Sequence, residues 1–527
     1  MILMLAKLIQ TVRPSAVTVI FLAIATGSSG LSLATHAREL GEIEIGIVED
    51  QTGESLVTRV QLLDSKGRAM RIKGARFARG WNLVEGPLLY RGRAGNYRYQ
   101  VFHGPQFSAG NGGFTLHDDG AGSDTLRLQR HANIADEGWR GADLLARGVP
   151  DLVRPWLAAE DLDLAVIVDE QTAAEQEVPD AESFVLQPTA SPADAAWVEH
   201  GSYHDTRPGS GLVLHHWLPP AEVPVDLPSS RLLVMSKQSV VPAGGLPVHN
   251  EIQRLWARDV PVWLASGHVD SIQILSEHLT RDGTDATKFT PYLEPDPGRF
   301  RGPRGPGRLI EYLYWQVLET GLRIPPSAGS GYGKGNSPLG YNRVYANTPH
   351  LSPNYWWLAL KAGNSFVTNG PLLRARVNGY DAGSILTVPR GQAEFHLDVT
   401  LTLTTSDPVE YLDVIFNGKT LYQARLDEYA KQGGVIPPLQ VTESGWAVVR
   451  VVTEREHTYR LASTAPFYIE FDGRARISRS AVRFFQDWLA KATKELASDA
   501  ESAAAAAPYL AAADMFWTQR LSEATAD

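Results

Sequence analysis

The spacing of hydrophobic and polar residues changes along this chain. From Gly41 to about Arg130, short runs such as Val57–Leu63 alternate apolar and polar residues and end at turn residues. This spacing predicts a small antiparallel sandwich. Much later, Val409–Phe416 leads into Asn417-Gly418, which is a strong hairpin signal between two alternating runs. A second sandwich is therefore predicted towards the end of the chain.

Between these two parts the apolar spacing is typical of helices that alternate with buried strands. Pro150–Ala158 has helical spacing and Leu162–Val168 is a continuous apolar run. Leu309–Thr320 places its apolar side chains on one helical face. Further predicted elements are buried strands at Leu212–Trp217 and Arg231–Met235, a strand at Arg343–Tyr345, a helix at Trp356–Ala362, and a Pro/Gly loop outside helix and core at Glu294–Arg308.

The last fifty residues are rich in alanine and predict helix. Ser480 is expected to cap the first helix, and the tail that follows is expected to break at Pro508. The predicted divisions of the chain are 1–37, 38–135, 136–375, 376–475 and 476–527, in order a signal peptide, a β-sandwich, an α/β part, a β-sandwich and a helical tail.

The start of the chain has the pattern of a secretory signal. Lys7 and Arg13 precede the apolar run Ala16–Ala25, and small residues lead to Ala37. We therefore expect an extracytoplasmic protein, periplasmic or secreted, that begins near Arg38. The alternative is an uncleaved anchor, although the run is short for a membrane span of about 20 residues. No later stretch is apolar enough to predict a span.

Composition excludes several classes of function. The 527 residues suggest three or four domains, and 43% hydrophobic residues allow each to bury a core. A net charge of -10 argues against nucleic acid or an anionic membrane surface as the main partner. The absence of cysteine excludes disulfides, thiolate metal sites and cysteine nucleophiles.

The most informative stretch is Val260–Asp282. Its run His268–Leu275 alternates apolar and polar residues and then presents Glu277 and His278. In parallel α/β barrels chemistry lies where strands end, so this pair reads as site residues, or equally as the opening of a loop. His200 and His204 have helical metal-ligand spacing, but the glycine between them makes a helix unfavourable there.

Several blocks in this order resemble the CehA/McbA-like branch of the PHP (polymerase and histidinol phosphatase) domain metallohydrolases. The blocks are EGW from Glu137, AEDL from Ala159, HNEIQRLWARDVPVWLASGHVDSI from His249, GLRIPPSAGS from Gly321, GYNRVY from Gly340 and AGNSFVTNGP from Ala362. The resemblance implies a distorted (β/α) barrel with divalent metal at its mouth. The stretch from Gly41 to about Arg130, with GEIEIGIVEDQTGESLVTRVQLLDSKGR from Gly41 and GNYRYQVFHGP from Gly95, resembles carboxypeptidase-regulatory-like modules. The expected fold class is thus α/β, a PHP-like barrel flanked by two antiparallel β-sandwiches and a helical tail.

The chain departs from the family at the metal ligands. Leu145 and Arg147 stand where the resemblance implies a His-x-His pair, and neither side chain binds a cation. His249, Glu251 and His278 match family ligands. With help from Asp169, Glu170 or His215, these three are expected to hold at most one metal ion.

Three functions follow from this pattern. The preferred one is an exported, non-catalytic or weakly catalytic protein that binds a small molecule or a polymer in the barrel mouth. Its expected ligand-binding residues are Arg147, Arg323, Asn342, Arg343, Thr368 and Asn369. The second is a mononuclear zinc or manganese hydrolase of an amide or ester bond, with metal ligands His249, Glu251 and His278 and catalytic residues Glu251 and His278. The third is a structural envelope protein. No oligomeric state is predicted.

Overall fold

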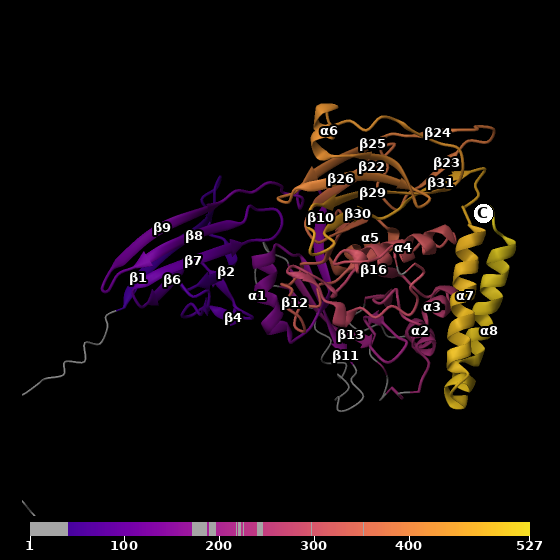
Figure 1. Ribbon diagram of the computed structural model, residues 1–527, viewed down its shortest axis with the longest axis horizontal. Coiled ribbons are helices and arrows are strands. Elements are labelled where there is room, and N and C mark those ends of the chain that lie inside the picture. Colours follow the sequence, from indigo (N-terminus) through magenta and orange to yellow (C-terminus); the bar gives the residue numbers. More distant parts are fainter. Residues whose placement is uncertain are drawn as a thin grey trace, which may run out of the picture. The chain divides into compact units, whose positions relative to one another are not determined.

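The protein is a mixed α/β, sheet-rich structure. The computed structural model describes residues 40–170, 187–188, 196–217, 219, 223–224, 226–239, 246–296, 298–350 and 352–527. The expected signal peptide lies outside the described residues. Within them the chain forms eight α-helices and several sheets, which Figure 1 labels in chain order. Leu40–Asp527 forms one compact unit.

Two sheets near the start of the described chain enclose a shared apolar core. Their strands are β1 Gly41–Glu49, β2 Val57–Leu63, β3 Ala69–Met70, β4 Arg76–Ala78, β5 Trp81–Glu85, β6 Leu88–Gly92, β7 Gly95–Phe102, β8 Gly110–Leu116 and β9 Ala121–Leu128. The order is β6-β1-β9 in one sheet and β4-β5-β2-β7-β8 in the other, with β3 beside β2. Alternate side chains such as Ile45, Val60 and Val101 fill the space between the sheets, as the sequence spacing predicts.

A long sheet follows and carries the candidate site. Its elements and covering helices are β10 Trp139–Ala146, α1 Pro150–Glu160, β11 Leu164–Glu170, β12 Gln187–Pro188, β13 Trp197–Asp205, β14 Leu212–His215, α2 Ser229–Lys237, β15 His249–Ile252, α3 Val260–Ala265, β16 Ser271–Leu275, α4 Gly305–Glu319, β19 Pro326–Ala328, β20 Arg343–Asn347, α5 Pro353–Ala362 and β21 Ser365–Thr368. A small hairpin, β17 Leu279–Thr280 and β18 Gly283–Thr284, lies between β16 and α4.

The first seven strands of this sheet run in the order β10-β11-β13-β14-β15-β16-β19. The pairs β10/β11/β13 and β15/β16/β19 are parallel, and β14 is antiparallel to both of its neighbours. A parallel bridge between Ala146 and Tyr332 joins the end of β10 to the segment after β19. The sheet therefore curls until its last strand returns to its first.

Two predicted elements of this part are wrong. Arg231–Met235 was expected as a strand but lies in the helix α2, because a short apolar run does not distinguish the two states. The loop predicted at Glu294–Arg308 ends early, since α4 begins at Gly305 with Pro306 in its first turn. Proline is favourable there because the first turn has no use for its missing N–H.

The long sheet continues into the C-terminal part of the chain. The elements there are β22 Leu372–Val377, β23 Ile385–Val388, β24 Phe395–Leu397, β25 Val399–Thr404, β26 Val409–Phe416, β27 Lys419–Ala424, α6 Leu426–Lys431, β28 Leu439–Val441, β29 Gly445–Thr453, β30 Leu461–Thr464 and β31 Phe467–Phe471. From β10 the sheet runs β20-β21-β30-β29-β26-β27, so hydrogen bonds link it across residue 375. The predicted hairpin is confirmed, with Asn417 and Gly418 at φ 50° and 71°.

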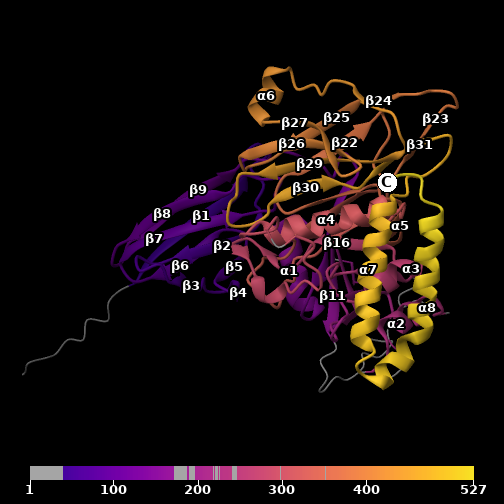
Figure 2. The ribbon, with the colours of Figure 1, turned by 45° about the vertical axis from the view of Figure 1, so that its right-hand side comes forward.

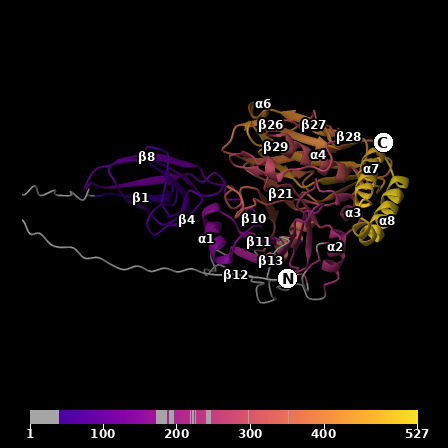
Figure 3. The same ribbon diagram turned by 60° about the horizontal axis from the view of Figure 1, so that its bottom comes forward.

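Two helices close the chain, α7 Arg479–Leu496 and α8 Ala500–Ser522. They lie side by side in Figures 2 and 3, and α8 also packs on α3. The cap of α7 is Ser478 rather than the predicted Ser480, since the Ser478 hydroxyl accepts a hydrogen bond from the Ala481 N–H. The predicted break at Pro508 is also wrong, because α8 continues through it, held on both sides by tertiary packing.

Candidate functional site

Three neighbouring strands direct polar side chains into the interior of the curled sheet. His215 ends β14, His249 and Glu251 lie two apart on β15, and Ser271 and Gln273 lie two apart on β16. Residues two apart on a strand share a face. His215 is the register partner of His249, and Glu251 of Ser271. All five are buried, so their polar atoms need partners within the protein.

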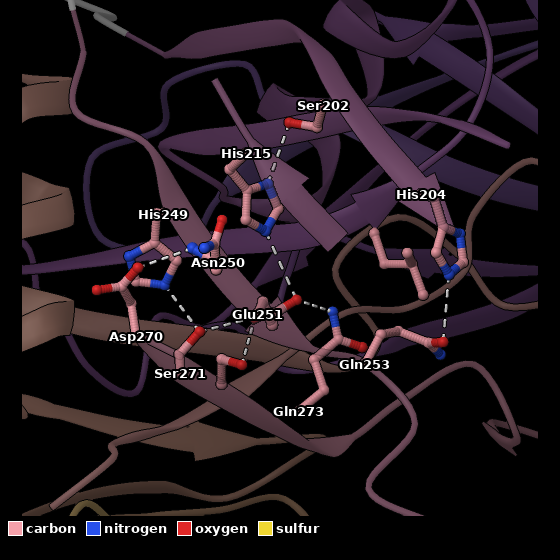
Figure 4. Close-up of polar contacts among 12 residues, drawn as sticks. Ser202, His204, His215, His249, Asn250, Glu251, Gln253, Asp270, Ser271 and Gln273 are labelled. Atoms are coloured by element: carbon pink, nitrogen blue, oxygen red, sulfur yellow. Dashed lines mark hydrogen bonds and ion pairs between the residues drawn. The ribbon is translucent and has the colours of Figure 1, made fainter. Parts of the chain in front are cut away.

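Glu251 is the centre of a hydrogen-bond network shown in Figure 4. Its Oε1 accepts from Gln273 Nε2 at 2.5 Å, and its Oε2 accepts from Ser271 Oγ at 3.2 Å. The Ser327 hydroxyl on β19 donates to the same Oε2. His215 Nε2 lies 3.6 Å from Oε1. Both carboxylate oxygens are therefore occupied by side-chain donors that come from the neighbouring strands.

The two histidines of the network are also held by hydroxyl groups. His249 Nε2 shares a hydrogen bond with Ser271 Oγ at 2.8 Å, and His215 Nδ1 shares one with Ser202 Oγ at 3.1 Å. The Trp357 ring lies 4.7 Å from the His249 ring and 4.9 Å from that of His215. Burial lowers the pKa of His249 well below its usual value, so this imidazole is neutral near pH 7.

The network continues on the far side of Gln273. Its Oε1 accepts from Ser276 Oγ at 2.9 Å, and Ser276 Oγ accepts from Gln253 Nε2 at 2.7 Å. Gln253 Oε1 lies 3.3 Å from His204 Nε2, on β13. An amide can both accept and donate, so it connects neighbours that a carboxylate would not.

Leu145 lies beside this network. It is fully buried on β10 and packs with Val168 and Val213. A Cβ on Gly329 would meet both Leu145 and the Gln273 amide, so Leu145 and Gln273 flank the same backbone segment. An aliphatic side chain thus occupies a place next to Glu251 where the resemblance implies an imidazole.

Arg147 pairs with a buried carboxylate. Its Nη2 lies 3.2 Å from Glu277 Oε2, with Lys288 Nζ at 3.6 Å and Arg254 Nη2 at 3.9 Å from the same carboxylate group. Burial alone would raise the pKa of Glu277, but the charges of Arg147, His204, Lys288 and Arg254 outweigh burial and lower it. Glu277 is therefore ionised, and its carboxylate pairs with Arg147, Lys288 and Arg254 rather than with a metal ion.

His278 is separated from the other expected metal ligands. Its ring packs against Trp256 at 5.1 Å and Phe289 at 5.3 Å, and neither ring nitrogen forms a hydrogen bond with the described residues. Burial lowers its pKa to about 3. No three His, Asp or Glu side chains of the described chain are grouped so as to hold a metal ion. The structure brings His249 and Glu251 together, but not His278.

The helper residues are divided in the same way. His215 joins the Glu251 network, whereas Asp169 lies 3.2 Å from His200 Nε2. The Glu170 side chain lies outside the described part. His200 and His204 lie on the strand β13, which confirms the prediction that a helix is unfavourable in this segment. As arranged, this donor set does not fit a divalent metal, because Glu251 and His249 already satisfy their polar atoms within the protein.

The expected ligand-binding residues do not share one pocket. Arg323 pairs with Glu470 and lies over the Tyr468 ring. The Asn342 amide donates to the carbonyls of Ser276 and Leu279 at 2.9 Å, which is a structural role.

Three others lie together. Arg343, Thr368 and Asn369 line one cavity of about 110 Å³. Arg343 Nη1 donates to the Glu160 carbonyl at 2.9 Å, and Asn369 Nδ2 donates to the Tyr459 carbonyl at 3.1 Å.

Comparisons with known proteins give no family. No protein-family model and no curated protein matches the sequence. Among solved structures, the Bacillus anthracis TIE protein is 13% identical over 21% of this chain and 20% of its own, with a TM-score of 0.15. The Parabacteroides merdae β-glucuronidase is 9% identical over 79% of this chain and 60% of its own, with a TM-score of 0.18. The Bacteroides uniformis β-glucuronidase 3 is 7% identical over 82% and 63%, with a TM-score of 0.17. This chain spans less than two thirds of each, and such scores do not establish a shared fold.

None of the described helices has the length and apolar character needed to cross a bilayer.

Proposed function

We propose that the chain is an exported PHP-like barrel protein that binds a ligand and in which a hydrogen-bond network replaces the metal centre. The observation that carries the proposal is the environment of Glu251, whose two oxygens accept hydrogen bonds from Gln273, Ser271 and Ser327. The curled strand order and the bridge between Ala146 and Tyr332 support a barrel.

The network supplies what a metal ion would otherwise supply. A buried carboxylate needs compensation, and neutral donors from serine and glutamine provide it without a cation. A metal ion at Glu251 would have to displace these donors and leave them buried without acceptors, which costs about 1–3 kcal/mol for each. Leu145 offers no ligand in exchange, and the Arg147 guanidinium adds a fixed positive charge. The chain's own residues therefore favour the metal-free state.

The ligand and the location remain those that the sequence predicts. The ligand is a small molecule or a polymer that enters at the barrel mouth, and the location is extracytoplasmic. The alternative is a mononuclear zinc or manganese hydrolase of amides or esters. That alternative requires His278 to move from the Trp256 and Phe289 rings towards Glu251. A structural envelope role is the third candidate, and no feature of the site favours it.

Metal analysis tests the proposal. The native protein is expected to purify without stoichiometric metal and to show no rise in Tm with zinc or manganese, because a ligand that binds only the folded state would raise it. The variant Leu145→His/Arg147→His supplies the two imidazoles that the resemblance implies. Metal binding by this variant but not by the native protein would support both the alignment and the lost centre. Stoichiometric native metal, abolished by His278→Ala, would contradict the proposal in favour of the hydrolase.

A further inference from the structure

The cavity of about 110 Å³ that Arg343, Thr368 and Asn369 line is polar and rich in arginine. Arg59, Arg281, Arg343 and Arg460 line it, with Glu160 as the only carboxylate among the lining residues. The arginines come from distant segments, since Arg59 lies on β2, Arg281 on the β17/β18 turn and Arg460 just before β30. Such a concentration of positive charge is unexpected in a chain whose net charge is -10.

Two of the arginines stack on one aromatic pair. The Arg59 Cζ lies 4.2 Å from the Trp81 ring and 4.9 Å from that of Phe102, and the Arg281 Cζ lies 5.2 and 4.4 Å from the same rings. Contact with the rings leaves the N–H groups at the edge of each guanidinium available to an acceptor. The Trp81 and Phe102 rings therefore hold two guanidinium groups, with their N–H donors, at the wall of the cavity.

These two guanidinium groups carry more N–H donors than the described residues offer hydrogen-bond acceptors. Arg59 is 5% exposed and pairs through Nε with Glu160, yet its buried Nη1 has no hydrogen-bond partner among the described residues. Arg281 forms no hydrogen bond and no ion pair with any residue that the structure describes. Burial, and then the charges of Arg59 and Arg460, lower the Arg281 pKa, although Asp282 and Glu160 act against this. Its positive charge is thus poorly compensated.

The lining of the cavity also includes Arg460 and Tyr341. Arg460 Nε lies 2.7 Å from Asp407 Oδ2, and the Arg460 guanidinium lies 5.7 Å from the Tyr341 ring. The Tyr341 hydroxyl is buried, and Arg460 and Thr458 are its polar neighbours, although neither forms a well-aligned hydrogen bond with it. Gly370 permits close approach, since a Cβ there would meet the Arg460 guanidinium. Arg59 Nη1 and the Tyr341 hydroxyl are thus buried polar groups without a well-aligned hydrogen-bond partner among the described residues, and both residues line this cavity.

We propose that this cavity binds a small oxyanion, a phosphate or carboxylate group, between Arg59, Arg281 and the Tyr341 hydroxyl. Guanidinium forks match the two oxygens of such groups, and an anion would compensate charges that now repel one another. The volume suits one charged group rather than a whole drug-sized ligand, for which pockets of roughly 300–1,000 Å³ are usual. Because Arg343, Thr368 and Asn369 of the expected ligand-binding residues line this cavity, the inference rests on the proposed ligand binding and names the chemical class of one ligand group, and it holds whether or not Glu251 binds metal.

Arg281→Gln is the variant that tests the site, because the side chain loses only its contact with the Trp81 and Phe102 rings and no hydrogen bond or ion pair with a described residue. Arg376→Gln is the matched control, since Arg376 is 60% exposed, pairs with Asp381 elsewhere and carries the same charge. Binding of inorganic phosphate and of acetate is measured by calorimetry and by Tm at constant ionic strength. EDTA is present throughout, so that the result is independent of metal at Glu251.

The native protein and Arg376→Gln are expected to bind one of the two anions and to gain Tm. In Arg281→Gln the Kd should rise by about tenfold or more, as expected for one charge-assisted hydrogen bond. The anion that binds shows whether the group is a phosphate or a carboxylate. The proposal is overturned if neither anion binds the native protein, or if all three proteins respond equally, which would be a general salt effect.

Discussion

Removing the Glu251 carboxylate is the sharpest perturbation of the network. Glu251→Ala deletes the acceptor of Gln273, Ser271 and Ser327 at once. The three donors then remain at a fully buried position, since the Glu251 side chain that they surround is itself fully buried. Glu251→Gln is the matched control, because it keeps the shape and one carbonyl acceptor, and the serine hydroxyls can rotate to accept from its amide.

The expected magnitudes differ between the two variants. A buried donor without an acceptor costs about 1–3 kcal/mol, and Glu251→Ala leaves three such donors. Because Ser271 can still bond His249, the lower part of the summed range is appropriate, about 3–5 kcal/mol for Glu251→Ala. For a domain of about 150–250 residues, such a loss of unfolding free energy lowers the Tm by roughly 10 °C. Glu251→Gln should cost only about 1 kcal/mol.

The assay is thermal unfolding of the three proteins at one scan rate, with and without EDTA. Comparison at one rate is needed because large chains often unfold irreversibly. If the network is structural, the gap between the two variants is the same in both buffers. If Glu251 instead holds a metal ion, both variants lose the same stabilisation and EDTA brings the native protein down to their level. That second result would refute the reasoning.

Three further predictions concern other parts of the chain. The pKa of His278 is about 3 in the folded protein against 6.5 when unfolded, so the folded state binds fewer protons and stability is lost as pH falls below 6.5. Between pH 6 and 4 the native protein should lose about 1.4 kcal/mol of unfolding free energy per pH unit more than His278→Leu. Denaturant unfolding measures this difference, and parallel stability curves of the two proteins would contradict the prediction. N-terminal sequencing of extracytoplasmic protein should begin near Arg38, and an intact Met1 in the cytoplasm would count against export. A chain that ends at residue 375 should not fold, because β21 loses β30 and the core loses Trp446 and Trp488; a cooperative unfolding transition of that fragment would show otherwise.

Local signals in the sequence predicted much of the fold. Asn417-Gly418 identifies its hairpin because few residues accept two positive φ angles in succession. Gly363, at φ 77°, ends α5 for the same kind of reason. The failures are at positions where tertiary packing decides. Arg231–Met235 is helical because α2 buries Leu232 and Leu233, and α8 passes Pro508 because neighbouring helices hold it.

The candidate site was only partly visible in the sequence. His249 and Glu251 were identified because their block resembles the family's metal-binding block, and on a strand a spacing of two gives them a shared face. Ser271 and Gln273 carried a signal of the same kind, since they alternate with apolar residues on a fully buried strand. Ser327 carried none, because only the return of β19 to the other strands brings it to Glu251. His278 was misplaced because the direction of a residue after a strand depends on the loop that follows.

The long sheet that crosses residue 375 has a consequence for how this protein can change. Strand β21 lies before that residue and β30 after it, and the two share backbone hydrogen bonds. A recombination event at this point would separate strands that complete each other, and it would expose an unpaired edge on each product. The strands before and after residue 375 are therefore expected to be inherited together, and an engineer who wishes to graft either set onto another scaffold would have to transfer both.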